Sequence, residues 1–167
     1  MIRALHTLWW KMDSPGGIPS GIRHLLRLPP EEYGVKMELV SGEDLPRSSR
    51  LILLLLSLGR RGVYRALKIK KDIELAKPVI AAKSREFNPH ILHPRDVYTA
   101  SAALELPQPM VLHVHGPALE EALSSGLARE GDEVYRFISA LEQRVFSRAA
   151  KIVAVSKNEE NLLLSKG

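Results

Sequence analysis

The chain has 167 residues, of which 45% are hydrophobic and 26% are charged. This length corresponds to one domain of about 150 residues, and the composition excludes disordered, collagen-like and disulfide-framework proteins. The sequence has no cysteine, which excludes disulfides, thiolate zinc sites and cysteine nucleophiles, and its net charge of +5 is compatible with a phosphate-bearing, nucleic-acid or lipid partner.

Strand and helix patterns alternate along the chain. The predicted strands are residues 2–8, 35–40, 90–93, 109–114 and 152–155. The predicted helices are residues 18–26, 46–87 with breaks at Gly59, Gly62 and Pro78, 96–106, 134–146, and a last helix that begins at a capping box, Ser156 to Glu159. Residues 118–131 are rich in glycine and serine, and we expect a mobile insertion there.

This alternation predicts an α/β fold, a single Rossmann-like domain with a parallel sheet and helices on both faces. In such sheets ligands bind beyond the carboxyl ends of the strands. The distinctive polar and small residues follow the predicted strands: Trp10 and Gly16-Gly17 after the first, His93 and Arg95 after the third, His115 and Gly116 after the fourth, and Ser156 and Lys157 after the fifth. The sequence therefore predicts one site at one end of the sheet.

The glycine pair Gly16-Gly17 opens a predicted helix, where free amides and the helix dipole favour an anion or a sugar hydroxyl. The spacing is neither G-x-G-x-x-G nor a Walker motif, so the dinucleotide and P-loop interpretations are weak. The alternative is a plain tight turn.

His113 and His115 share one face of a strand, which raises the possibility of a metal pair. Zinc requires a third ligand, and no obvious one is present. We instead expect His115, followed by Gly116, to project into a crevice. No G-x-S-x-G motif or Ser/His/Asp arrangement supports nucleophilic hydrolysis.

His93 and Arg95 at a strand exit indicate substrate binding, or else Arg95 forms a surface ion pair of little energetic value. Ser156 is foremost a helix cap. One of Trp9 and Trp10 belongs to the core, and the other shapes an acceptor pocket.

Residues 51–58 are apolar, and residues 60–71 are basic with interleaved apolar side chains. This pattern predicts either peripheral binding to an anionic membrane or a core helix with a solvated end. The apolar run is too short to cross a bilayer. The N-terminus has no pattern of a secretion signal, so we expect a cytoplasmic protein, either free or peripheral to the inner face of the membrane.

Four segments in order resemble motifs of the N-terminal domain of GT-B glycosyltransferases of the retaining family 4: residues 15–18, 88–93, 110–116 and 149–156. The first is similar to a glycine-rich loop, the third to a strand ending in His-Gly, and the fourth to a strand followed by Val-Ser. His90 and Lys151 depart from the family pattern.

The resemblance implies that residues 1–167 form the acceptor-side domain and that the C-terminal donor-binding domain is absent from this chain. It implies transfer from a nucleotide-sugar donor to a saccharide or lipid-linked acceptor with retention, without cofactor or essential metal and without nucleic acid. His115 would be catalytic, with Gly16, Gly17 and Gly116 at the donor phosphates. The acceptor side would be lined by Trp10, His93 and Arg95.

Two rival classes remain at this point. One is a non-catalytic α/β binding or membrane-anchoring subunit that partners a separate catalytic chain. The other is a small α/β hydrolase or metal enzyme.

Overall fold

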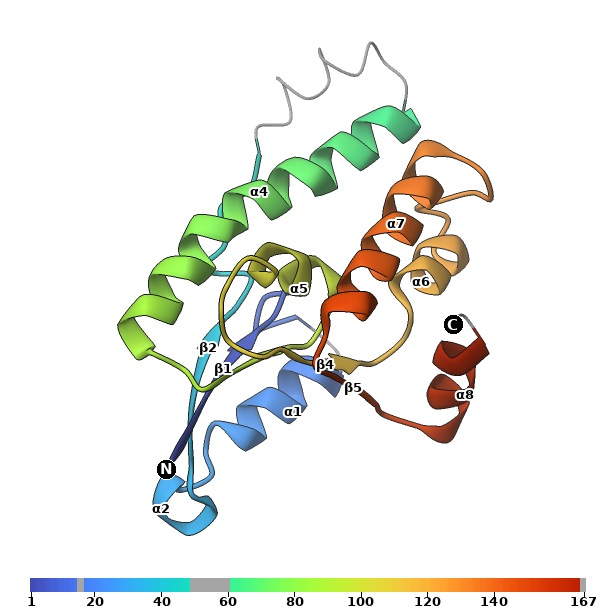
Figure 1. Cartoon of the computed structure of the whole chain (residues 1–167). Coiled ribbons are helices and arrows are strands. Elements are labelled where there is room, and N and C mark those ends of the chain that lie inside the picture. Colours follow the sequence, from blue (N-terminus) through green and yellow to red (C-terminus); the bar gives the residue numbers. More distant parts are fainter. Residues whose placement is uncertain (15–16, 49–60, 166–167) are drawn as a thin grey trace.

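A computed structural model describes residues 1–14, 17–48 and 61–165 of the chain (Figure 1). Its five strands are β1 (Ile2–Thr7), β2 (Val35–Val40), β3 (Ile91–Pro94), β4 (Val111–Val114) and β5 (Lys151–Ala154). The seven described helices are α1 (Gly17–Leu25), α2 (Pro30–Tyr33), α4 (Arg61–Phe87), α5 (Val97–Ala103), α6 (Ala118–Ser124), α7 (Glu133–Arg148) and α8 (Lys157–Ser165).

All strand pairs are parallel. Three strands join in the order β2-β1-β3, β4 pairs with β5, and a single bridge between Leu92 and Met110 connects the two groups. Across that bridge the order is β2-β1-β3-β4-β5, one of the two common doubly wound arrangements. The predicted α/β class with a Rossmann-like sheet is thereby confirmed.

Side chains alternate between the two faces of the strands. One face, here called the core face, carries Leu5, Leu92 and Leu112, which are at most 1% exposed. They belong to one apolar cluster with residues of α4, α5 and α7, and these helices lie together on one side of the strands in Figure 1. Helix α1 lies on the other side.

The opposite face, here called the histidine face, carries His6, His93, His113 and His115. The strand register pairs His6 with His93, and their rings lie 4.6 Å apart. A buried imidazole ring still needs hydrogen-bond partners for its two nitrogens, whereas the leucines of the core face need only close packing.

The predicted breaks at Gly62 and Pro78 are wrong, because helix α4 runs unbroken through both residues. Pro78 is exposed, while Ile73, Ala76 and Ile80 on the other side of the helix are buried. Burial of that apolar stripe outweighs the backbone hydrogen bond that a proline removes. Gly59, the third predicted break, lies outside the described residues.

The helix predicted from residue 46 does not extend to Pro46–Ser48, which have no regular structure. Residues 51–58 and Arg60 of the proposed membrane segment lie outside the described residues. Arg65 in that segment donates from Nη1 to the carbonyls of Gly126 and Leu127. No helix of the described ranges is both long and apolar enough to cross a membrane.

The expectation of a mobile insertion at residues 118–131 is wrong for most of the segment. Residues 118–124 form α6, and Leu119, Ala122 and Ala128 are buried in the core cluster. The amide of Ala128 also donates to the carbonyl of Ala122 at 2.9 Å. Three apolar anchors spaced through a glycine-containing segment hold it against α7.

Candidate functional site

The chain reverses its direction across the sheet between β1 and β3, so the ends of these strands flank the topological switch point. The amide of Arg95 donates to the carbonyl of Thr7 at 3.0 Å, and Asp96 Oδ2 accepts from the amide of Trp9 at 2.8 Å. Asp96 Oδ1 accepts from the amide of Thr99 at 2.8 Å and caps α5. One buried carboxylate therefore fixes both strand exits and the start of a helix.

The Asp96 carboxyl is buried, and burial raises its pKa to about 6 although the amides of Thr99 and Trp9 oppose this shift. The group thus holds its charge at neutral pH through the hydrogen bonds that it accepts.

Four of the predicted site residues line one small cavity at the carboxyl ends of the strands. They are Trp10, Arg95, His115 and Gly116, which follow β1, β3 and β4. The cavity has a volume of about 20 Å³, enough for about one water molecule. These four residues therefore lie together at one end of the sheet, as the sequence predicts. Their roles in binding and catalysis stay predictions.

The other three predicted residues lie elsewhere. Gly17 is the exposed first residue of α1, and its neighbour Ile18 does line the cavity. Gly16 lies outside the described residues. His93 is not among the residues that line the cavity, because it sits one step back in the row of histidines.

The histidine rings form a row across three strands. His93 stacks on His113 with ring centres 5.7 Å apart, and His113 stacks on His115 at 4.6 Å. In the described part of the chain, no three histidine or acidic side chains are grouped to hold a metal ion. The rings are stacked face to face, whereas histidines that hold a metal ion point their ring nitrogens at one common position.

The row consists of neutral imidazoles. Burial, together with the charge of Arg95, lowers the pKa of His6 to about 4, and burial with the charges of His6 and Arg95 lowers that of His93 to about 3. Burial and Arg95 also lower the pKa of His113 to about 4, and they lower that of His115. At pH 7 the row therefore carries no positive charge of its own.

The Nη2 atom of Arg95 lies 3.2 Å from Nε2 of His115. A guanidinium only donates, so Nε2 accepts this hydrogen bond and the ring proton resides on Nδ1. This pair gives the cavity a fixed cation beside an oriented, neutral imidazole that retains one donor.

The two tryptophans after β1 divide as the sequence predicts. Trp9 packs against the core cluster and against the ring of Tyr98, with ring centres 5.3 Å apart, whereas Trp10 lines the cavity.

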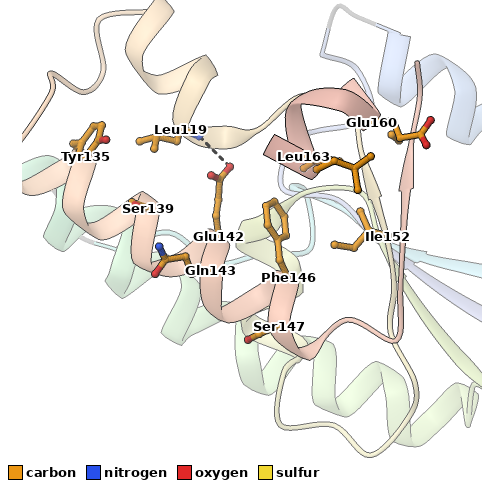
Figure 2. A pocket seen from close by; sticks show the side chains of 12 residues that line it. Leu119, Tyr135, Ser139, Glu142, Gln143, Phe146, Ser147, Ile152, Glu160 and Leu163 are labelled. Carbon is orange, nitrogen blue, oxygen red and sulfur yellow. Dashed lines mark hydrogen bonds between the residues drawn. The ribbon is translucent and has the colours of Figure 1, made fainter. Parts of the chain in front are cut away.

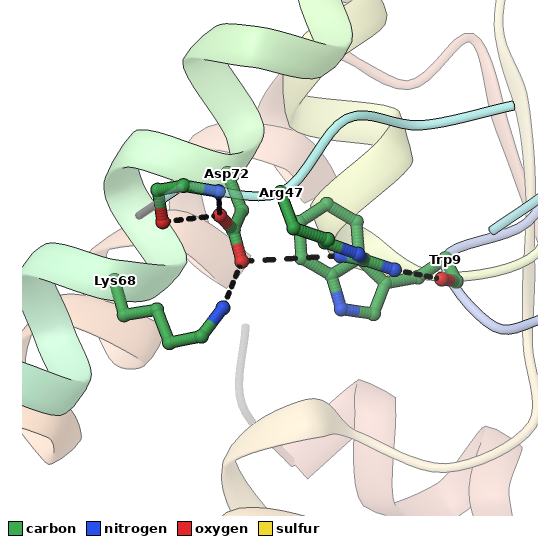
Figure 3. A network of polar contacts seen from close by, with 5 residues as sticks. Trp9, Arg47, Lys68 and Asp72 are labelled. Carbon is green, nitrogen blue, oxygen red and sulfur yellow. Dashed lines mark hydrogen bonds and ion pairs between the residues drawn. The ribbon is translucent and has the colours of Figure 1, made fainter. Parts of the chain in front are cut away.

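Sequence reasoning missed the contacts that hold this tryptophan turn. Figure 3 shows the Arg47 guanidinium over the Trp9 ring, 4.3 Å from its centre, and Arg47 Nη2 donates to the Trp9 carbonyl at 2.8 Å. Asp72 of α4 lies 4.0 Å from Arg47 Nη1 and accepts from Lys68 and Ser48. Lys68 and Asp72 are four residues apart on α4, whereas the contacts of Arg47 with Trp9 and of Ser48 with Asp72 join residues distant in sequence. No local pattern could have indicated these distant contacts.

Gly42 was also missed as a site-positioning residue. Its amide donates to the carbonyl of Trp10 at 2.9 Å. A Cβ at this position would lie 2.6 Å from the Trp10 carbonyl carbon and 2.7 Å from the amide nitrogen of Lys11. Glycine is required here because the backbones that follow β1 and β2 are in direct contact. The Ser41-Gly42 pair at the end of a strand was the available signal.

A larger cavity lies away from these residues, between α6, α7, β5 and α8, and has a volume of about 910 Å³ (Figure 2). Its lining includes the carboxylates of Glu142 and Glu160 and apolar side chains such as Phe146 and Leu163, but no lysine, arginine or histidine. Glu142 Oε1 accepts from the amide of Leu119 at 3.2 Å. The small cavity also has two carboxylates in its wall, Asp96 and Glu121, but it contains in addition the guanidinium of Arg95, a group that can bind a phosphate.

Ser156 acts as the predicted cap. Its hydroxyl accepts from the amide of Glu159 at 3.2 Å and lies 3.0 Å from a carboxylate oxygen of Glu159, which in turn exerts an electrostatic effect on His115.

A family model described as Glycosyltransferase Family 4 matches residues 15–167. The search of curated proteins and the search of solved structures each gave no significant match.

Proposed function

The chain belongs to glycosyltransferase family 4, and from that premise we propose that it is the acceptor-side half of an enzyme that transfers a sugar from a nucleotide-sugar donor. The acceptor in this proposal is a saccharide or a lipid-linked saccharide, and the configuration at the anomeric carbon is retained. In this proposal the donor is held mainly by a second, donor-binding domain.

One observation carries the proposal: Trp10, Arg95 and His115 come from the ends of three strands and line one cavity at the switch point of the sheet. Ligands of doubly wound sheets bind in that position. An aromatic ring, a guanidinium and an imidazole are suited to a sugar ring, a phosphate and a hydroxyl, respectively.

In a retaining transfer of this kind, the donor's own phosphate assists removal of the acceptor proton, so the protein chiefly positions groups and stabilises charge. His115 contacts the donor sugar or the leaving phosphate, and its Nδ1 proton is free to donate, since Nε2 is engaged by Arg95. The amides of Gly16, Gly17 and Gly116 approach the diphosphate.

On the acceptor side, Trp10 and Arg95 line the wall of the cavity. His93 acts one layer behind, where its ring supports His113 and, through it, His115. A volume of about 20 Å³ is far smaller than a sugar. We therefore expect the substrate space to form above these residues, between this domain and the donor domain.

The test compares purified residues 1–167 alone with the same residues joined to a donor-binding domain, here called the completed enzyme. Nucleoside diphosphate release and transfer to an acceptor are measured over a panel of nucleotide sugars. We expect transfer only when the donor domain is present, with the anomeric configuration retained by NMR. Transfer by the chain alone would overturn the division into two halves. A completed protein that binds its partner but transfers nothing would favour the non-catalytic subunit.

A further inference from the structure

Arg95 is a buried cation without a counter-ion. The residue is 5% exposed, and within the residues that the structure describes its Nε atom has no hydrogen-bond partner. The undescribed residues 15–16, 49–60 and 166–167 contain no aspartate or glutamate, so every acidic side chain of the sequence lies in the described part of the chain. None of them forms an ion pair with Arg95 there. A buried charge in this state is costly unless something else compensates it.

Two carboxylates share the cavity with Arg95, Asp96 and Glu121, and neither forms an ion pair with it. Asp96 accepts from the amides of Trp9 and Thr99. The carboxylate of Glu121 lies beside Gly116, where it would be 3.3 Å from a Cβ. Burial lowers the pKa of Arg95, and no acidic neighbour opposes this effect. The guanidinium therefore keeps its capacity to bind an anion.

We propose that Arg95 and His115 form a binding site for a phosphate group. This inference refines the function proposed above by giving one substrate a phosphate at this position, borne by a sugar acceptor or by the donor. Arginine suits this task because its planar fork donates two parallel hydrogen bonds to a phosphate. Glu121 and Trp10 on the cavity wall are suited to the hydroxyls and ring of the sugar that carries it.

The histidine row supports the same assignment. The imidazoles behind Arg95 are neutral, so in the described part of this site the positive charge that attracts a phosphate is that of Arg95, and the His115 Nδ1 proton is a second donor. A bound phosphate would offset the charge of Arg95. The pKa of His115 should then rise, since burial and Arg95 lower it while Glu159 favours the charged form.

The experiment follows the Arg95 Nε–H signal and the His115 ring signals of the chain by NMR. The added probes are inorganic phosphate, glucose 6-phosphate and uridine diphosphate, each at constant ionic strength with chloride as the reference. We expect saturable shifts of both residues and a higher His115 pKa when phosphate is present. Tighter binding of glucose 6-phosphate than of uridine diphosphate assigns the phosphate to the acceptor, and the reverse order assigns it to the donor. No saturable shift with any probe overturns the proposal.

Variants separate binding from folding. Arg95→Gln should reduce phosphate affinity at least tenfold, while the matched variant Arg85→Gln, at an exposed position, removes the same charge and should leave affinity unchanged. Arg95→Lys retains the charge without the fork and should bind with intermediate affinity. Equal affinity of Arg95→Gln and the wild type would contradict the proposal.

Arg95→Met tests the uncompensated charge directly. Its melting temperature in phosphate-free buffer should equal or exceed that of the wild type, because it removes a buried, unpaired charge. A marked fall would instead assign Arg95 a structural role and overturn the proposal. If the completed enzyme transfers sugar but Arg95 and His115 bind no phosphate, the phosphate site is refuted and the proposed function stands. If they bind phosphate but no sugar is transferred, the proposed function is refuted and the phosphate site stands.

Discussion

Leu112 and His113 are neighbours in β4, yet they lie on opposite faces of the sheet. Leu112 is fully buried in the apolar cluster with residues of α4, α5 and α7. His113 is partly exposed and stacks between the rings of His93 and His115. Two adjacent residues of one strand thus belong to regions with different physical demands.

The difference separates stability from function. The core face buries hydrocarbon, which needs no partner beyond close packing. Among the described residues, the histidine face leaves Nδ1 of His6 and Nε2 of His93 buried without a hydrogen bond, and it holds its imidazoles in the neutral form. Such unfavourable arrangements persist where binding or catalysis requires them. The predictions below test whether the two faces are separable.

The largest expected effect is a loss of stability in acid. The ordinary histidine pKa is 6.5, but in the folded chain it is about 4 for His6, about 3 for His93 and about 4 for His113. Between pH 6.5 and pH 4 the unfolded chain therefore binds more protons than the folded chain. The free energy of unfolding should fall as the pH falls through this window.

Asp96 has the opposite sign, since its pKa rises from 3.8 to about 6 on folding and its contribution to stability grows as the pH falls. Burial also raises the pKa of Glu121, so two carboxyls oppose four imidazoles whose pKa values are lowered, and the net change remains destabilising. Urea denaturation at steps from pH 7.5 to pH 4 measures it. A free energy of unfolding that is constant or higher at pH 4.5 would show that the histidine face imposes no cost.

Leu112→Ala tests the core face. Removing a fully buried leucine should lower the free energy of unfolding by about 2–5 kcal/mol, through lost burial and the cavity that remains. Chemical denaturation measures this loss. In the completed enzyme, turnover per folded molecule should not change. A variant that stays folded but transfers slowly would mean that the core face also shapes the site.

His115→Ala tests the site end of the histidine face. In the completed enzyme we expect kcat to fall about 10²–10³-fold, since loss of one charge-stabilising contact typically costs about 2.7–4 kcal/mol. The acceptor KM should change much less. Kinetics and a circular dichroism melt are measured on the same preparation. A lower melting temperature with normal turnover of the folded fraction would make His115 a structural residue.

The sequence was sufficient for features that depend on local pattern. Apolar runs marked all five strands, and the residues that follow them identified Trp10, Arg95 and His115 as neighbours in space. It was insufficient where distant segments decide the outcome. The α4 helix continues through Pro78 because its opposite side is buried, and Arg47 reaches Trp9 from 38 residues away. Packing of this kind has no signature within a short window of sequence.

The smallest effect is expected for His113→Phe, which retains a flat ring between His93 and His115 but removes one titrating group. A swap of similar shape in a partly exposed position should change the free energy of unfolding by less than about 1.5 kcal/mol at pH 7.5. Below pH 6 the variant should become more stable than the wild type, because its unfolded state no longer gains a proton at this position. Urea denaturation of both proteins at pH 7.5 and pH 5 gives the four free energies that are needed. Leu112→Ala is the control, since its loss should be equal at the two pH values. The free energy of unfolding of His113→Phe could instead differ from that of the wild type by the same amount at pH 5 and at pH 7.5. Protonation of the histidine row would then not be what weakens the fold in acid, and the two faces would differ in packing alone.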